Sequence, residues 1–147
     1  MKQPLAYIHP AAKIAPSVVI DPFVTIDQNV EIGEGTRICS NVTILEGSRI
    51  GKNCIIFPGA VIGAIPQDLK FRGEDTLAII GDNTTIRECV TVNRGTAARG
   101  KTQVGSNCLI MAYSHVAHDC IVGDNVIISN ATQLAGEVVV DNYAVIG

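Results

Sequence analysis

Aliphatic residues recur at every sixth position along almost the whole chain. The series begins at Ile8 and ends at Ile146, and Ile, Val or Leu occupies 21 of its 24 positions. The exceptions are Asp68, Glu74 and Ala98. Because these three residue types are only a minority of an ordinary chain, chance does not explain the series, and it indicates an internal repeat of six residues.

The other positions of the repeat are also patterned. Four residues after each aliphatic comes a small or β-branched residue, as at Ala12, Val24 and Cys54. Proline recurs two residues after the aliphatic, and Asn or Gly recurs three residues after it, as in "FPGA" at 57–60. Proline followed by a residue that tolerates positive φ is typical of a type II turn. Each hexad is therefore expected to form one short extended segment and one corner.

This pattern predicts an all-β fold. A period of six does not match the 3.6-residue period of a helix, and frequent β-branched residues and prolines oppose helix formation. Three hexads form an 18-residue coil with three flat sides, and stacked coils form a parallel β-helix of triangular section, which is a solenoid. We expect one such domain over residues 1–147. Three cysteines, Cys54, Cys108 and Cys120, occupy the small inward position and are expected in the core.

Two excursions interrupt the repeat without changing its phase. The first spans roughly residues 63–79 and the second roughly 94–103. Loops on a rigid scaffold often carry function, although tolerated surface insertions are the alternative. The first excursion brings Gln67, Asp68, Lys70 and Arg72 close together, which favours a site for a polar ligand.

Two of the three histidines lie in "MAYSHVAHDC" at 111–120, and neither His115 nor His118 occupies an inward position. They could be a solvated corner pair, metal ligands or a general base. A zinc site needs a third ligand nearby, and His9 lies about six coils away, so no metal site is expected. Imidazole titrates near neutral pH, which suits a general base.

The repeat resembles the hexapeptide-repeat, left-handed β-helix family of acyltransferases. "QDLKFRGE" at 67–74, "RECVTVNRGT" at 87–96, "HVAHDC" at 115–120 and "LAGEV" at 134–138 are similar to the UDP-N-acetylglucosamine O-acyltransferases that begin lipid A synthesis. The resemblance implies left-handed coils with two external loops. It also implies transfer of a 3-hydroxyacyl chain from acyl carrier protein to the sugar 3-hydroxyl. No cofactor is implied other than this acyl donor.

The resemblance also implies roles for individual residues. His118 would be the general base, Asp119 would orient it, and the Gly136 N–H would stabilise the oxyanion. The implied substrate contacts are Gln67, Asp68, Lys70, His115, Gln133 and Glu137, with Asp68 and Lys70 reaching the site from a neighbouring subunit of a homotrimer. The family commonly has a histidine after "LAG", where this chain has Glu137. An ionised carboxylate accepts but does not donate hydrogen bonds, so this contact is expected to differ.

Composition restricts the remaining possibilities. The net charge of −3 does not favour nucleic-acid binding, and no apolar stretch is long enough for a membrane span. Five cysteines without a CxxC pair suggest reduced thiols and a cytoplasmic protein.

The chain stops at Gly147, the second residue of a hexad. The resemblance implies that further coils and a C-terminal helical domain are missing, so we expect this form to be weakly active or inactive. Two rival enzymes are the sister UDP-sugar N-acyltransferase and the small-molecule acetyltransferases with the same repeat. A non-catalytic β-helix scaffold is the alternative from another class, although a repeated outward row of one residue type is absent and two polar loops interrupt the coils.

Overall fold

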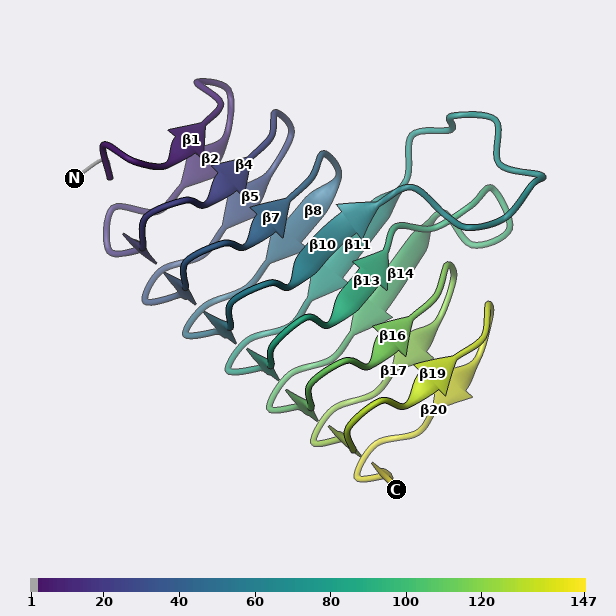
Figure 1. The fold of residues 1–147 in the computed structure, drawn as a ribbon. Coiled ribbons are helices and arrows are strands. Elements are labelled where there is room, and N and C mark those ends of the chain that lie inside the picture. Colours follow the sequence, from purple (N-terminus) through teal and green to yellow (C-terminus); the bar gives the residue numbers. More distant parts are fainter. Residues whose placement is uncertain (1–2) are drawn as a thin grey trace.

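A computed structural model describes residues 3–147 as a stack of triangular coils built from three parallel sheets of seven short strands (Figure 1). Each coil contributes one strand to each sheet. This arrangement confirms the predicted all-β fold, a parallel β-helix of triangular section built from six-residue repeats with two external loops.

The strands are two to four residues long. Sheet A contains β1 (Tyr7–Ile8), β4 (Thr25–Ile26), β7 (Thr43–Ile44), β10 (Val61–Ala64), β13 (Thr91–Asn93), β16 (His115–Val116) and β19 (Gln133–Leu134). Sheet B contains β2 (Lys13–Ile14), β5 (Glu31–Ile32), β8 (Ser48–Ile50), β11 (Leu77–Ile80), β14 (Lys101–Val104), β17 (Ile121–Val122) and β20 (Val139–Val140). Sheet C contains β3 (Val19–Ile20), β6 (Arg37–Ile38), β9 (Ile55–Ile56), β12 (Thr85–Ile86), β15 (Leu109–Ile110), β18 (Ile127–Ile128) and β21 (Val145–Ile146).

The strand register shows how the two excursions fit into the stack. Ordinary partners are one coil, or 18 positions, apart, as for Tyr7 and Thr25. Val61 instead pairs with Thr91, 30 positions on, and Thr91 pairs with His115, 24 positions on. The first loop, residues 65–76, therefore adds two hexads, and the second loop, residues 94–100, adds one. Both loops leave the same edge of the prism, where a sheet A strand turns into a sheet B strand (Figure 1). We call this edge the AB corner.

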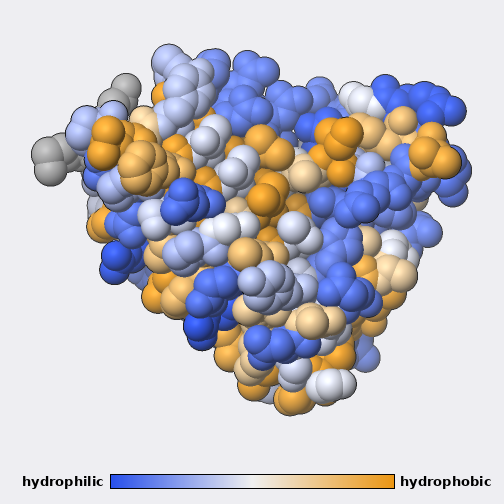
Figure 2. All heavy atoms as spheres, in the orientation of Figure 1, coloured by the Kyte–Doolittle hydropathy of each residue, from blue (hydrophilic) through white to orange (hydrophobic). Residues whose placement is uncertain are grey.

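The predicted inward positions form the core. Ile38, Val116 and Ile128 have no exposed surface, and Cys54, Cys108 and Cys120 are buried free thiols. The aliphatics of the end coils, among them Ile8 and Ile146, are only half-buried, because these coils are covered on one side. The visible outer face mixes hydrophilic and hydrophobic residues, and hydrophilic residues gather where the loops project (Figure 2).

The corners adopt the left-handed backbone conformation that the sequence suggests, but not only at Asn and Gly. Asn29, Asn41 and Gly59 have positive φ as expected. Phe23 and Tyr113, at the same position of the hexad, also have positive φ, at 65° and 63°. The register between coils fixes this geometry, so the tertiary structure overrides the weak preference of an aromatic residue against it.

The register generates a stability prediction. Truncating Ile38 or Ile128 to Ala removes fully buried atoms from a packed column and should lower the free energy of unfolding by about 2–5 kcal/mol. Arg37, the exposed neighbour of Ile38, serves as the control, and Arg37→Ala should cost less than about 1 kcal/mol. Urea titration measures both values, and equal losses at Ile38 and Arg37 would contradict the hexad register.

Candidate functional site

The candidate site is built on the AB corner, where four separate parts of the chain meet. His118 lies in the turn after β16, and Gly136 lies at the same corner one coil later, after β19. The first loop leaves this corner after β10 and the second leaves it after β13. A corner held by parallel strands on both sides is a rigid place to fix a side chain.

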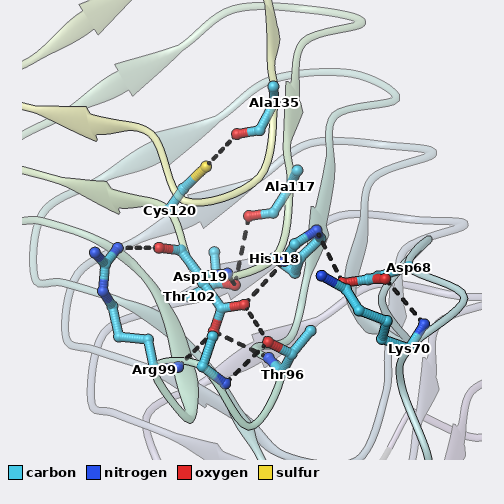
Figure 3. Close-up of polar contacts among 11 residues, drawn as sticks. Asp68, Lys70, Thr96, Arg99, Thr102, Ala117, His118, Asp119, Cys120 and Ala135 are labelled. Atoms are coloured by element: carbon cyan, nitrogen blue, oxygen red, sulfur yellow. Dashed lines mark hydrogen bonds and ion pairs between the residues drawn. The ribbon is translucent and has the colours of Figure 1, made fainter.

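His118 is held from one side and faces an opening on the other. Its Nδ1 lies 2.9 Å from Oδ2 of Asp119, and its Nε2 lies 3.8 Å from Oδ2 of Asp68 (Figure 3). The side chain is 18% exposed, so it is reachable from solvent without being freely solvated. A hydrogen bond from Nδ1–H to the carboxylate leaves Nε2 as the acceptor of the neutral imidazole.

Asp119 is the buried partner of this histidine. Burial by itself raises the pKa of a carboxyl group, but here hydrogen bonds from Thr96, from His118 and from the backbone N–H of Arg99 outweigh it and hold the pKa of Asp119 below its usual value. The carboxylate therefore remains ionised at neutral pH. An ionised Asp119 favours the Nδ1–H form of the neutral imidazole and stabilises the imidazolium that follows protonation.

His115 lies beside His118 on the outer face of sheet A. Its Nδ1 is 2.7 Å from the hydroxyl oxygen of Thr91, the residue that pairs with it in β13. Burial lowers the pKa of His115 and the nearby His118 lowers it further, while the contact with Thr91 opposes the shift. His115 is therefore neutral at pH 7 and suited to hydrogen bonding rather than to carrying charge.

Gly136 packs directly against the His118 ring. A Cβ atom at Gly136 would lie 2.5 Å from both Cε1 and Nε2 of His118, closer than real carbon atoms approach. Only glycine lets this corner pass so near to the imidazole. Among residues 3–147, nothing accepts a hydrogen bond from the Gly136 N–H, so this group is available to a ligand beside His118.

Two hollows flank His118. The first has a volume of about 260 Å³ and is lined by Asp68, Lys70, Glu74, Thr96, Ala97, Ala98, His118 and Glu137. The second, an open groove of about 480 Å³, is lined by Gln67, Thr91, Asn93, His115, Ala117, His118, Gln133, Leu134, Ala135 and Gly136. Of the nine residues to which the resemblance assigns a role, eight line one or both hollows, and Asp119 contacts His118 directly. Arg72, also singled out in the first excursion, lines neither hollow.

Contacts within the chain determine which groups of the expected substrate-binding residues remain available to a ligand. Gln133 donates from Nε2 to the carbonyl oxygen of Tyr113 at 3.0 Å, so its amide is already engaged with the backbone. Lys70 donates its backbone N–H to Oδ1 of Asp68 at 2.9 Å, and its side chain has no hydrogen-bond partner among residues 3–147. Glu137 is exposed at the rim of the first hollow.

The expected placement of Asp68 and Lys70 in a neighbouring subunit is wrong. Both residues reach His118 from the same chain, because the first loop leaves the same corner as His118 two coils earlier. The expectation came from the resemblance to a homotrimeric family, combined with the distance of both residues from His118 along the sequence. In the strand register, Val61, Thr91 and His115 are successive partners. Residues far apart in the sequence therefore lie in nearby coils at the same corner.

Thr96, Thr91 and Asn93 also belong to the site, although the sequence did not single them out. All three lie in "TVNRGT" at 91–96, a motif quoted only for its resemblance to the family. Thr96 contacts the Asp119 carboxylate, and Asn93 is a buried residue whose Oδ1 has no hydrogen-bond partner among residues 3–147. Their hexad positions place them one coil before His115 and His118, and this was the sequence signal that could have identified them.

Residues 3–147 contain no group of three or more His, Cys, Asp or Glu side chains placed to hold a metal ion. The same part of the chain contains no helix that is long and apolar enough to span a membrane.

Comparisons with known proteins agree with this geometry. Residues 2–104 match the family described as the GMPPB C-terminal domain, and residues 101–136 match the bacterial transferase hexapeptide family (six repeats). The acyl-[acyl-carrier-protein]–UDP-N-acetylglucosamine O-acyltransferase of Aliarcobacter butzleri is 58% identical over 87 residues, which cover 58% of this chain and 34% of the relative.

Solved structures extend the similarity to nearly the whole chain. The UDP-N-acetylglucosamine acyltransferase of Bacteroides fragilis is 59% identical with a TM-score of 0.97, covering 99% of this chain and 57% of that one. The acyltransferase of Francisella novicida is 46% identical with a TM-score of 0.96, covering 99% of this chain and 53% of that one.

The chain thus spans a little more than half the length of these solved structures, and its match covers about a third of the curated relative. Its repeat, its three-sheet coil and the family matches agree, and together with the similar structures they confirm the left-handed β-helix that the resemblance implied. The chain therefore belongs to the family of the GMPPB C-terminal domain, and its resemblance to the hexapeptide-repeat acyltransferases, the UDP-N-acetylglucosamine O-acyltransferases among them, is confirmed.

Proposed function

We propose that this chain is the β-helix portion of an acyltransferase that moves a 3-hydroxyacyl chain from acyl carrier protein to the 3-hydroxyl of UDP-N-acetylglucosamine, the first step of lipid A synthesis. The observation that carries the proposal is the position of His118, with Nδ1 bonded to a buried carboxylate and Nε2 facing a polar hollow. The names of the similar proteins supply the substrate classes.

In this proposal His118 is the general base. Nε2 takes the proton of the sugar 3-hydroxyl while the sugar oxygen attacks the thioester carbonyl of the acyl donor. The resulting imidazolium is stabilised by the Asp119 carboxylate at 2.9 Å. When the tetrahedral intermediate collapses, the carbon–sulfur bond breaks, and the imidazolium returns its proton to the departing carrier-protein thiolate. No cysteine nucleophile and no cofactor take part in this direct transfer.

The backbone N–H of Gly136 is proposed to stabilise the oxyanion. It lies beside the base and has no other partner in residues 3–147, so it can donate to the carbonyl oxygen as negative charge develops there. One well-aimed donor of this kind lowers a barrier by about 3 kcal/mol.

The remaining side chains of the two hollows are proposed to bind substrate. Asp68 and Lys70 border the first hollow beside Nε2 of His118, where a hydroxyl-rich sugar or its phosphates can be bound. Gln67, His115 and Gln133 line the groove on the opposite side of the ring. The carboxylate of the exposed Glu137, at the rim of the first hollow, offers acceptor oxygens to a bound substrate.

A homotrimer is proposed on separate grounds. The outer face of sheet C exposes aliphatic side chains, and Val19, Ile55 and Val145 have 54%, 40% and 70% of their surface accessible. Packing three prisms side by side would remove such surface from water. The proposed base and the loop residues beside it come from one chain, so each subunit would supply its own His118–Asp68 pair.

The general base is tested by replacing His118 with alanine. Transfer from 3-hydroxyacyl carrier protein to UDP-N-acetylglucosamine, followed by mass spectrometry, should slow at least about 100-fold. The free energy of unfolding should change by only about 1 kcal/mol, because the ring sits in a corner and is not part of the core. His9→Ala, which removes the histidine farthest from the site along the stack, is the matched control and should leave transfer unchanged.

Because the chain spans little more than half of the similar structures, slow turnover is expected, and the ratio of variant to wild-type rate is the quantity compared. A His118→Ala protein that keeps most of the wild-type rate would show that another group is the base. Transfer to an amino sugar but not to the hydroxyl acceptor would favour the sister N-acyltransferase instead.

Gly136→Ala tests the close approach of this corner to the imidazole. The added methyl group would lie 2.5 Å from the His118 ring, so the ring must move and transfer should fall at least about tenfold. Gly147→Ala is the control, because its Cβ would meet only Ser129 Oγ at 3.9 Å. Equal activity of the Gly136→Ala and Gly147→Ala proteins would remove Gly136 from the site.

The oligomeric state is tested by light scattering at micromolar concentration. We expect a mass three times the 15.5 kDa of the chain. Placing a charge in the exposed apolar face, as in Ile55→Glu, should shift the equilibrium toward the monomer, whereas Thr25→Glu on the outer face of sheet A should not. A monomeric wild-type protein would contradict the trimer.

A further inference from the structure

Asp119 and Glu137 occupy the same position of the hexad at the AB corner, one coil apart. Both are acidic, and both have the left-handed backbone conformation, with φ of 62° and 65°. Glu137 is exposed, as are Phe23 and Tyr113 at the equivalent hexad position of another corner, whereas Asp119 has no exposed surface. The corner geometry is shared, so it does not account for the burial of Asp119.

The second loop accounts for the burial of Asp119. Residues 94–100 fold over Asp119, and the backbone N–H groups of Thr96 and Arg99 donate to Oδ1 at 3.0 and 3.1 Å (Figure 3). The Arg99 guanidinium also donates to the carbonyl oxygen of Asp119. The loop therefore binds both the side chain and the backbone of this residue.

The two carboxylate oxygens of Asp119 have different hydrogen-bond partners. Oδ1 accepts both backbone N–H groups of the loop, which fixes the plane of the carboxylate. Oδ2 accepts the hydroxyl of Thr96 at 2.5 Å and faces Nδ1 of His118 at 2.9 Å. Thr96 is thus the one side chain of the loop that shares an oxygen with the catalytic histidine. It is 7% exposed, so water is largely excluded from this contact.

We propose that Thr96 is a positioning residue, whose hydroxyl holds the Asp119 carboxylate in place and aimed at His118. The inference rests on the proposed function and gives the second loop, which also lines the first hollow, a role that acts through Asp119. The hydroxyl is one of four donors to the carboxylate, and removing it leaves Oδ2 buried with the imidazole alone.

Other charged groups near the pair define its electrostatic surroundings. Asp68, Lys70, Glu74 and Glu137 line the hollow in front of His118, and His115 lies behind it. None of the hydrogen bonds of the Asp119 carboxylate comes from these groups, so a change at Thr96 acts on the carboxylate first.

The test uses Thr96→Val, which keeps the shape of the side chain and removes the hydroxyl. NMR titration of the Asp119 carboxyl carbon in the whole chain should show its pKa rising by about one unit, because the charged form loses a donor. Thr96→Ser should restore the wild-type value. Thr84→Val is the control, since Thr84 is also buried and, within residues 3–147, its hydroxyl bonds to backbone groups alone.

A kinetic measurement accompanies the titration. In the transfer assay Thr96→Val should lower kcat about tenfold with KM within twofold, because the base and not the substrate is affected. The pH profile of kcat/KM should change for Thr96→Val but not for Thr84→Val. If Thr96→Val does not fold, Thr96→Ala replaces it with the same expected results.

The outcomes separate this inference from the proposed function. An unchanged Asp119 titration in a folded Thr96→Val protein overturns the positioning role, whatever the enzyme does. A raised Asp119 pKa with unchanged kcat also overturns it, because the carboxylate would then not matter for transfer. A raised pKa in a protein whose His118→Ala variant is fully active contradicts the proposed function and leaves the contact itself established.

Discussion

The structure depends on one backbone constraint, a corner every six residues that takes the left-handed conformation at a fixed position of the hexad. The constraint recurs from Phe23 to Tyr143, with φ between 52° and 90° at each corner residue that adopts it. It lets each strand hydrogen-bond to the strand one coil away, and it points the next aliphatic into the core. Because an interruption of whole hexads preserves this phase, loops of two hexads and of one hexad can leave the prism without disturbing the coils around them.

The candidate site uses that constraint in a specific way. The left-handed residue of a corner usually directs its side chain outward, as Tyr113 does. At Asp119 the side chain instead lies under the second loop, where two backbone N–H groups and one hydroxyl donate hydrogen bonds to its carboxylate. Burying a charged carboxylate is unfavourable, but these hydrogen bonds offset that cost. The ionised Asp119 is therefore available to bond His118. Rigid coils fix the imidazole and the glycine beside it, while the loops supply the polar surroundings.

Much of this arrangement could be predicted from the sequence. The aliphatic period determines the coil, the core and the phase of both loops, because each inward residue lies on a column that repeats every third hexad. The positive φ of Phe23 and Tyr113 could not be predicted from residue type, since aromatic residues rarely adopt it and only the stacking of coils imposes it. Likewise, burial of Asp119 depends on how the second loop folds back, and a loop without a repeat carries no periodic signal.

The position of Asp68 is a different case. Its closeness to His118 follows from the register, because the first loop and His118 leave sheet A at the same corner in nearby coils. Separation along the sequence suggested two subunits, although counting hexads would have placed both residues in one. In a solenoid, therefore, residues should be compared by hexad position and coil before they are compared by sequence distance.

The most direct test of the account is a crystal structure of the protein with bound UDP-N-acetylglucosamine. The account predicts that the sugar lies in the hollows that flank His118, with its 3-hydroxyl oxygen at hydrogen-bond distance, about 2.6–3.2 Å, from Nε2. It also predicts that Nδ1 remains bonded to Asp119. A sugar bound away from the AB corner, or one whose 3-hydroxyl points away from His118 toward solvent, would contradict the assignment of this corner as the site of acyl transfer.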